Sequence, residues 1–201
     1  MRRVVVLALL ALALPMAAWA DGITLTNEFG SISVSNAGIS STGSELTSFN
    51  GIVAPAGHAL GTVSFTTGAL TSGTLATGGT FSATGSSFLV VGKGNYGEPK
   101  GTIFSGSFVG PIIWTLVSGT KGGTQEFQLS GNIEGMLYTG RMVSGSTIQD
   151  IYTTKGQLAK GIGHIKLGTT SISTPEPGTL GLLGTGLVGI AGMFRRKLTR
   201  G

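Results

Sequence analysis

Two glutamates in the second half of the chain have the side chain that acid–base catalysis uses. Glu126 and Glu134 lie on short runs that we predict to be β-strands, and two carboxylates facing one cleft can hydrolyse a glycosidic bond. The even spacing with Gly131 between them is equally typical of two acids that face solvent. We favour the solvent-facing interpretation, and a secreted hydrolase that uses Glu126 or Glu134 as its acid remains the third functional hypothesis.

Cysteine, histidine and aspartate, which commonly bind metals, are absent or scarce in this chain. The chain contains no cysteine, and its two histidines, His58 and His164, have neither a second histidine nor an aspartate at ligand spacing. Asp21 and Asp150 are the only aspartates, which leaves no calcium loop. We therefore predict no catalytic residue, no metal site and no cofactor, and we expect solvated or structural roles for both histidines.

Residues 92–97 match the pattern G-x-G-x-x-G, which in dinucleotide-binding proteins opens a helix beneath a pyrophosphate. Here Glu98 and Pro99 follow where that helix must begin, and no acidic residue lies about 20 positions later to bind a ribose. The segment is therefore predicted to be a glycine-rich turn.

Aromatic residues gather in the second half of the chain and could form a platform for sugar rings. A β domain of this size must also bury its largest side chains. We expect Trp114, which lies in an apolar run, and most of the others to belong to the core. The aromatic residues considered are Phe104, Phe108, Trp114, Phe127, Tyr138 and Tyr152.

The elements that would carry these residues are short apolar runs separated by glycine. Several alternate with period two and are rich in Thr, Val, Ile and Phe, as half-buried strands are. Residues 21–174 are thus predicted to form a single Gly/Ser/Thr-rich all-β domain, an antiparallel β-sandwich or a barrel-like sheet. Residues 69–85 indicate either two hairpin strands with small side chains or a mobile loop. The predicted strands are 23–26, 31–35, 62–66, 87–91, 102–104, 108–117, 126–130, 132–134, 136–138, 147–154 and 164–167.

The net charge of +5 comes from the two ends of the chain. Six of the 13 basic residues lie outside residues 21–174, and within that range the basic and acidic residues balance. Nucleic-acid binding would need positive charge clustered on a folded face, so we predict no nucleic-acid partner.

The N-terminus has the layout of a secretory signal. A short positive segment precedes the apolar run 4–14, Pro15 follows, and Ala18 and Ala20 place small residues before Asp21. The run is too short for a permanent anchor. We predict a signal peptide at residues 1–20, cut by signal peptidase so that the mature chain begins at Asp21.

The C-terminal tail has three parts. Pro175, Glu176 and Pro177 precede the uncharged stretch 178–194, which as a helix would measure about 25 Å and could cross the inner membrane. A basic end at 195–201 would keep the terminus cytoplasmic. The membrane stop consists of Arg195, Arg196, Lys197 and Arg200.

The combination of a Pro-Glu-Pro triplet, one apolar helix and a terminal arginine cluster resembles the PEP-CTERM sorting signal of Gram-negative bacteria. In that family exosortase, an integral-membrane cysteine enzyme, reads the triplet and passes the protein on to the surface. The resemblance covers about residues 174–200 and none of the β domain. A plain single-pass anchor is the alternative interpretation.

Three functional hypotheses follow. The first is a non-enzymatic surface or extracellular-matrix protein, exported, anchored in the inner membrane before processing, and then sorted to the cell surface or released. The resemblance implies an association with exopolysaccharide and biofilm, which makes extracellular polysaccharide an expected partner. The second is a carbohydrate-binding β module that uses exposed aromatics, and the third is the secreted hydrolase.

Overall fold

The computed structural model describes residues 22–119, 123–154 and 156–173, and in these ranges the glycine-separated runs are β-strands. Several predicted functional residues lie outside the described ranges. They are the signal-cleavage residues Ala18, Ala20 and Asp21, the sorting triplet Pro175, Glu176 and Pro177, and the membrane stop Arg195, Arg196, Lys197 and Arg200. The predicted membrane helix 178–194 is also outside them. Among the described residues, no helix is long and apolar enough to cross a membrane.

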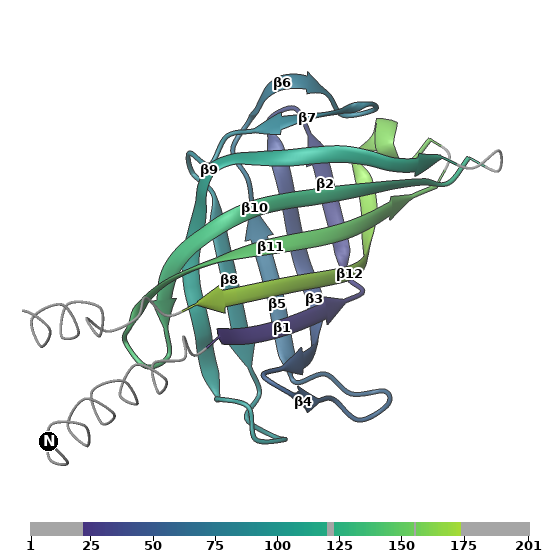
Figure 1. Ribbon diagram of the computed structural model, residues 1–201. Coiled ribbons are helices and arrows are strands. Elements are labelled where there is room, and N and C mark those ends of the chain that lie inside the picture. Colours follow the sequence, from purple (N-terminus) through teal and green to yellow (C-terminus); the bar gives the residue numbers. More distant parts are fainter. Residues whose placement is uncertain (1–21, 120–122, 155, 174–201) are drawn as a thin grey trace, which may run out of the picture. The chain divides into compact units, whose positions relative to one another are not determined.

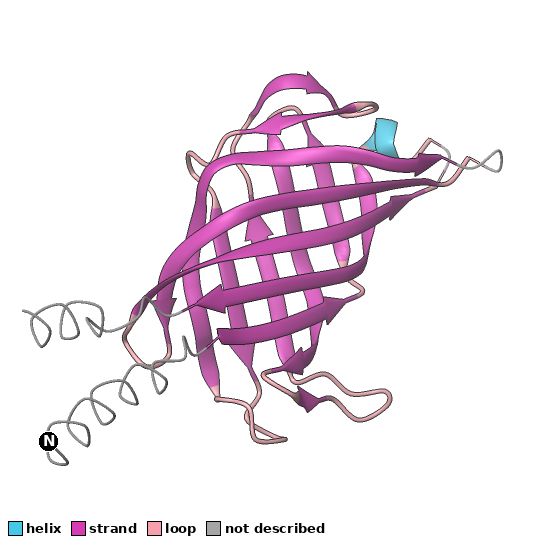
Figure 2. Cartoon of the chain, viewed as in Figure 1, coloured by secondary structure: helices cyan, strands magenta, loops and turns pink. Residues whose placement is uncertain are grey.

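Twelve strands and one short 3-10 helix, η2 (Leu158–Lys160), make up the described part of the chain (Figures 1 and 2). The strands are β1 (Gly22–Glu28), β2 (Ser31–Ser35), β3 (Gly38–Phe49), β4 (Ile52–Val53), β5 (Gly61–Thr66), β6 (Leu70–Thr74), β7 (Gly78–Phe81), β8 (Ser87–Gly92), β9 (Gly101–Gly119), β10 (Gln125–Leu137), β11 (Met142–Thr153) and β12 (Ile162–Ser173).

Eight of these strands close into an antiparallel barrel. Their order is β10-β11-β12-β1-β3-β5-β8-β9, and β9 pairs in turn with β10. Strand β2 extends β1, since both lie between β12 and β3. In the same way β7 continues β8 along β9, and β6 adds a strand beyond β7. The predicted all-β fold is confirmed, and the barrel is the form that it takes.

Strand β9 bends to join two differently oriented parts of the barrel wall. Figure 1 shows β10, β11, β12 and β1 crossing in front, while β3, β5 and β8 run steeply behind them. Gly110 of β9 has a φ of 74°, in the left-handed region that glycine adopts readily. The pairing with β10 shifts register at this point, between Ser130 and Asn132, as expected of a β-bulge.

One half of the barrel interior is aromatic. Phe88 lies with its ring centroid 5.9–6.2 Å from those of three other phenylalanines. The Trp114 indole stacks on Phe127 at 4.5 Å and donates a hydrogen bond from Nε1 to the carbonyl of Leu75. These side chains come from β5, β8, β9 and β10, and all are buried. The aromatic half consists of Phe65, Phe88, Phe104, Phe108, Trp114 and Phe127.

The opposite half, formed by β1, β3, β11 and β12, contains a buried layer of amides and hydroxyls. Asn27 Nδ2 donates to Ser44 Oγ at 2.7 Å and to Gln149 Oε1 at 2.9 Å. Gln149 Nε2 donates to Thr147 Oγ1, which is 2.8 Å from Thr170 Oγ1. A Cβ at Gly168 would collide with the Asn27 and Gln149 amides. The polar half consists of Asn27, Ser44, Thr147, Gln149 and Thr170.

The structure departs from the predicted strands in several places, since β9 and β10 each join runs that were predicted separately and β11 begins earlier, at Met142. Strand β3 was not predicted, because it contains the buried Ser41 and Ser44 and a register shift that interrupts the period of two. Strand β12 continues past residue 167 to Ser173, with Gly168 and Thr170 facing inward. Of the two interpretations of residues 69–85, the hairpin of β6 and β7 is confirmed.

Candidate functional site

A row of five side chains crosses neighbouring strands on the outer face of the barrel. The pairing register places Ser31 of β2 beside His164 of β12, which lies beside Tyr152 of β11. Tyr152 in turn lies opposite Glu126 of β10, and Glu126 opposite Ser118 of β9. We call these five residues the outer row. Because adjacent strands lie about 4.8 Å apart, the row is about 19 Å long.

Phe29 lies beside the outer row, at the junction between β1 and β2, in a backbone conformation that is costly for a phenylalanine. Its φ is 60°, and Gly30 follows with φ 90°. Gly30 has no substitute here, since a Cβ would lie 2.7 Å from the backbone nitrogen of Ser44. A bulky residue in this region costs about 1–2 kcal/mol, yet the Phe29 side chain is 61% exposed. Burial therefore does not compensate the strain.

Three rings border one hollow on this face. Tyr152 and His164 stack with their ring centroids 5.4 Å apart and an interplanar angle of 30°, and Tyr152 is 37% exposed. Together with Phe29 and Lys166 they line a hollow of about 300 Å³. We call Phe29, Tyr152 and His164 the aromatic patch. The aromatic patch exposes ring surface to solvent, and one of its rings, that of Phe29, is attached to a strained backbone.

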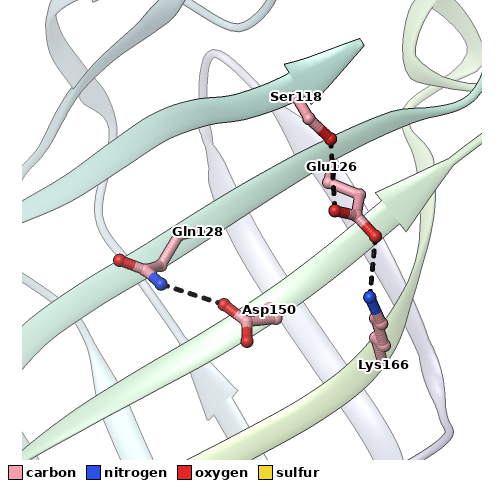
Figure 3. A network of polar contacts seen from close by, with 5 residues as sticks. All are labelled: Ser118, Glu126, Gln128, Asp150 and Lys166. Carbon is pink, nitrogen blue, oxygen red and sulfur yellow. Dashed lines mark hydrogen bonds and ion pairs between the residues drawn. The ribbon is translucent and has the colours of Figure 1, made fainter. Parts of the chain in front are cut away.

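Ionic and amide groups continue the surface toward β9 and β10 (Figure 3). Lys166 Nζ lies 2.8 Å from Glu126 Oε1, and Ser118 Oγ donates to Glu126 Oε2 at 3.2 Å. Beside them Gln128 Nε2 donates to Asp150 Oδ1 at 3.0 Å. A second hollow of about 160 Å³ is bordered by Glu126, Gln128, Asp150 and Lys166, and it shares Lys166 with the first.

The ion pair shifts the ionisation of both partners. The hydrogen bond from Lys166, followed by that from Ser118, lowers the pKa of the Glu126 carboxyl, and Glu126 raises the pKa of the Lys166 ammonium. Both groups are solvent-exposed, so the pair adds little to the stability of the fold. Its main effect is to hold a carboxylate and an ammonium in fixed positions beside the aromatic patch.

The structure does not bring Glu126 and Glu134 together, as a glycosidase that uses both carboxylates would require. Glu126 and Glu134 lie on the same strand, β10, about 26 Å apart at the usual rise per residue. The two carboxyls of a glycosidase lie roughly 5–9.5 Å apart. Glu134 instead borders a different hollow on the outer face, among the hydroxyls of Ser144, Ser146 and Ser171. The solvent-facing interpretation of the pair is thus the one that the geometry supports.

The two histidines lie in different surroundings. His58 is exposed in the loop between β4 and β5, with its ring 6.0 Å from that of Tyr96. His164 is part of the aromatic patch. Within the ranges 22–119, 123–154 and 156–173, no group of three or more His, Asp or Glu side chains is placed to hold a metal ion.

The segment that matches G-x-G-x-x-G is a turn, as predicted, and its amides bind a carboxylate of the same chain. The backbone nitrogens of Asn95 and Tyr96 each donate to Glu98 at 2.9 Å. Burial raises the pKa of the Glu98 carboxyl, but the hydrogen bonds from the turn outweigh it and the pKa is lowered. The N–H groups that would bind a phosphate in a nucleotide site are therefore already used.

Sequence reasoning found part of this surface and missed the rest. Phe104, Phe108, Trp114 and Phe127 are buried as expected, and Tyr138 and Tyr152 are the exposed members of the predicted aromatic set. Phe29, His164 and Lys166 were not recognised as partners of Tyr152. The available signal was an aromatic residue followed by glycine between two predicted strands, where glycine indicates a turn or a bend.

Comparison with known proteins concerns the tail and not the barrel. Residues 173–197 match the family model of the PEP-CTERM protein-sorting motif. The searches of curated proteins and of solved structures returned no match to this chain. The matched segment begins at the last residue of β12 and includes the triplet Pro175, Glu176 and Pro177. The chain therefore carries a PEP-CTERM protein-sorting motif, and this motif implies export and exosortase sorting to the cell surface.

Proposed function

We propose that this protein is a non-enzymatic component of the exopolysaccharide matrix at the cell surface. The observation that carries the proposal is the sorting motif at residues 173–197, which implies export and processing by exosortase. The barrel would then act outside the inner membrane, and its outer surface would be available for contact with exopolysaccharide.

The packing of the barrel supports a role for its outer surface. Eight strands enclose an interior just wide enough for side chains to fill. In this barrel the aromatic half and the polar half occupy that space, together with aliphatic residues such as Leu25, Leu46 and Ile172. Contacts with other molecules are therefore made by the side chains that point outward.

The second candidate function, a carbohydrate-binding module, is favoured by the aromatic patch. Phe29 is exposed in a strained conformation beside the stacked Tyr152 and His164. The two candidates are compatible, because a matrix protein that binds polysaccharide belongs to both classes.

The route to the surface involves signal peptidase and exosortase. Signal peptidase is expected to cut before Asp21, because Ala18 and Ala20 suit its small-residue pockets. The two prolines of the triplet, which restrict φ and remove a donor, are expected to be part of what exosortase recognises. Glu176 supplies a carboxylate that a cationic group of exosortase could bind.

The sorting part of the proposal is tested in a host that contains exosortase. Replacing Glu176 by Ala, or Pro175 and Pro177 by Ala, should block processing and leave membrane insertion intact. As the matched control, neutralising Arg195, Arg196 and Lys197 should instead weaken membrane retention and orientation. Mass spectrometry of both mature termini gives the readout. Processing of the Glu176→Ala protein at the wild-type rate would make the tail an ordinary anchor.

The matrix part is tested by fractionation. In the wild-type host the processed protein should co-fractionate with exopolysaccharide. In a strain that makes no exopolysaccharide it should move to the medium. An unchanged distribution in that strain would contradict a matrix role and leave the sorting result unaffected.

A further inference from the structure

We propose that the aromatic patch and the outer row form a binding site for a neutral polysaccharide chain, an inference that rests on the proposed function and specifies its ligand. The first argument is the backbone of Phe29. A φ of 60° at a residue whose side chain is 61% exposed is a cost without a packing benefit. Such strained positions cluster at binding sites, because there the orientation of the side chain matters for the ligand.

The second argument is the combination of chemical groups. A sugar ring has an apolar C–H face, which packs on aromatic rings, and an edge of hydroxyls, which donate and accept hydrogen bonds. Phe29, Tyr152 and His164 supply the rings, and Glu126 and Lys166 supply a charged acceptor and a charged donor beside them. Hydrogen bonds to charged groups are the stronger kind, which suits a site that must compete with water.

The third argument is shape. The hollow at the aromatic patch shares Lys166 with the hollow beside Gln128 and Asp150, so the two adjoin. The outer row crosses five strands over about 19 Å. A surface of this length is suited to several consecutive units of a polymer rather than to one small molecule.

The charge of the surface selects the class of polysaccharide. Among the described residues that line the two hollows, Glu126 and Asp150 are the carboxylates, and Lys166 is the lysine, already paired with Glu126. Glu28 adjoins Phe29 in the chain and lies opposite Glu45 of β3. An anionic polymer such as a uronate would meet this excess of carboxylates, and like charges oppose association. The surface therefore favours a neutral chain.

The test uses the full chain in a detergent without a sugar headgroup. The probes are the neutral and the acidic fractions of the host exopolysaccharide, separated by anion exchange. Calorimetric titration should show binding to the neutral fraction. Phe29→Gly and Tyr152→Ala should each lower the affinity at least about tenfold, because each removes a ring from the site. Tyr138→Ala is the matched control, since Tyr138 is 53% exposed but lies outside the site, and it should bind as wild type does.

The Phe29→Gly variant separates binding from folding. Glycine adopts φ 60° without strain, so the variant should keep or raise Tm while it loses affinity. A lowered Tm with unchanged affinity would make Phe29 a structural residue and overturn the inference. Tighter binding of the acidic fraction, or wild-type affinity in both variants, would also overturn it and leave the matrix role intact. Failure to bind either fraction would count against the matrix role itself.

Discussion

The two halves of the barrel interior are stabilised in different ways. In the aromatic half, four phenylalanine rings from β5, β8 and β9 pack against one another, and the Trp114 indole of β9 stacks on Phe127 of β10. In the polar half, hydrogen bonds link Asn27 of β1 with Ser44 of β3 and Gln149 of β11. Burial of a large apolar side chain contributes about 1.5–3 kcal/mol to the stability of the fold. This contribution depends little on how the side chain is oriented toward its neighbours. A buried amide contributes less to stability than this when it is hydrogen-bonded. It destabilises the fold strongly when its hydrogen-bond partner is lost.

This difference indicates that the two halves have different roles in folding. The polar half lies where the barrel closes, since β1 pairs with β12 near the two ends of the described chain. Asn27 and Gln149 are 122 positions apart and contact each other through two hydrogen bonds. A one-residue slip of β1 would turn the Asn27 side chain to the outer face and leave the Gln149 amide buried without this partner. We infer that the aromatic half supplies most of the burial energy and that the polar half selects the register of closure.

The largest effect is expected in the aromatic half. Phe88→Ala should lower the free energy of unfolding by about 4 kcal/mol, because it leaves a cavity among Phe65, Phe104 and Phe108. Urea unfolding followed by circular dichroism measures it, and Phe88→Leu should lose clearly less. A loss below about 1 kcal/mol for Phe88→Ala would show that the cluster is loosely packed.

A smaller loss is expected in the polar half. Gln149→Leu should cost about 2–3 kcal/mol, since the Asn27 amide and the Thr147 hydroxyl lose a partner in a buried layer. The double variant with Asn27→Leu should recover part of the loss, because both amides are then gone. Additive losses in this cycle would show that the amides do not act as a pair and would weaken the proposed role in register.

Lowering the pH should weaken the contribution of the turn at residues 92–99 to stability, but not that of the two halves of the barrel interior. The hydrogen-bonded members of the polar half are amides and hydroxyls, whereas Glu98 has a lowered pKa in the folded state. Its contribution is therefore present above the unfolded-state pKa and is lost as the pH falls through the folded-state pKa. Glu98→Gln should lose about 2 kcal/mol at neutral pH, and the difference from wild type should shrink in acid. Glu134→Gln, at an exposed site, is the control.

The smallest effect concerns a buried hydroxyl without a partner. In the described part of the chain, Thr153 Oγ1 makes no hydrogen bond although it is buried. Thr153→Val keeps the shape and removes the hydroxyl, so it should stabilise the fold by about 1 kcal/mol. Thr147→Val, by contrast, should destabilise it, because this hydroxyl bonds to Gln149 and Thr170. Thermal unfolding of the two variants shows whether the signs differ.

How much of the fold was predictable depended on which residues faced inward. Where inward positions are apolar, as at Phe127, Leu129 and Ile133 of β10, the period of two was visible and the strand was predicted. In β3 the inward positions include Ser41 and Ser44, and the strand was missed. Serine and threonine inside a barrel have the same pattern as residues on a solvent-facing loop, because the sequence does not show their hydrogen-bond partners.

The candidate site was less predictable than the fold. Tyr152 was considered as part of a sugar platform, but Phe29 and His164 were not connected with it. These residues are brought together by the pairing of β11 with β12 and of β12 with β2. No local pattern encodes such contacts, and the positive φ of Phe29 is a property of the folded backbone.

The sequence by itself determined the all-β class, the turn at residues 92–97 and the sorting motif at residues 173–197. These features depend on local chemistry, namely strand periodicity, glycine and proline geometry, and a short linear signal read by an enzyme. Only the tertiary structure decided that the sheet closes, that Asn27 meets Gln149, and that Phe29 lies beside Tyr152. Closure and cross-strand contacts depend on register between distant segments, and that register is selected by packing and hydrogen bonding in the assembled barrel.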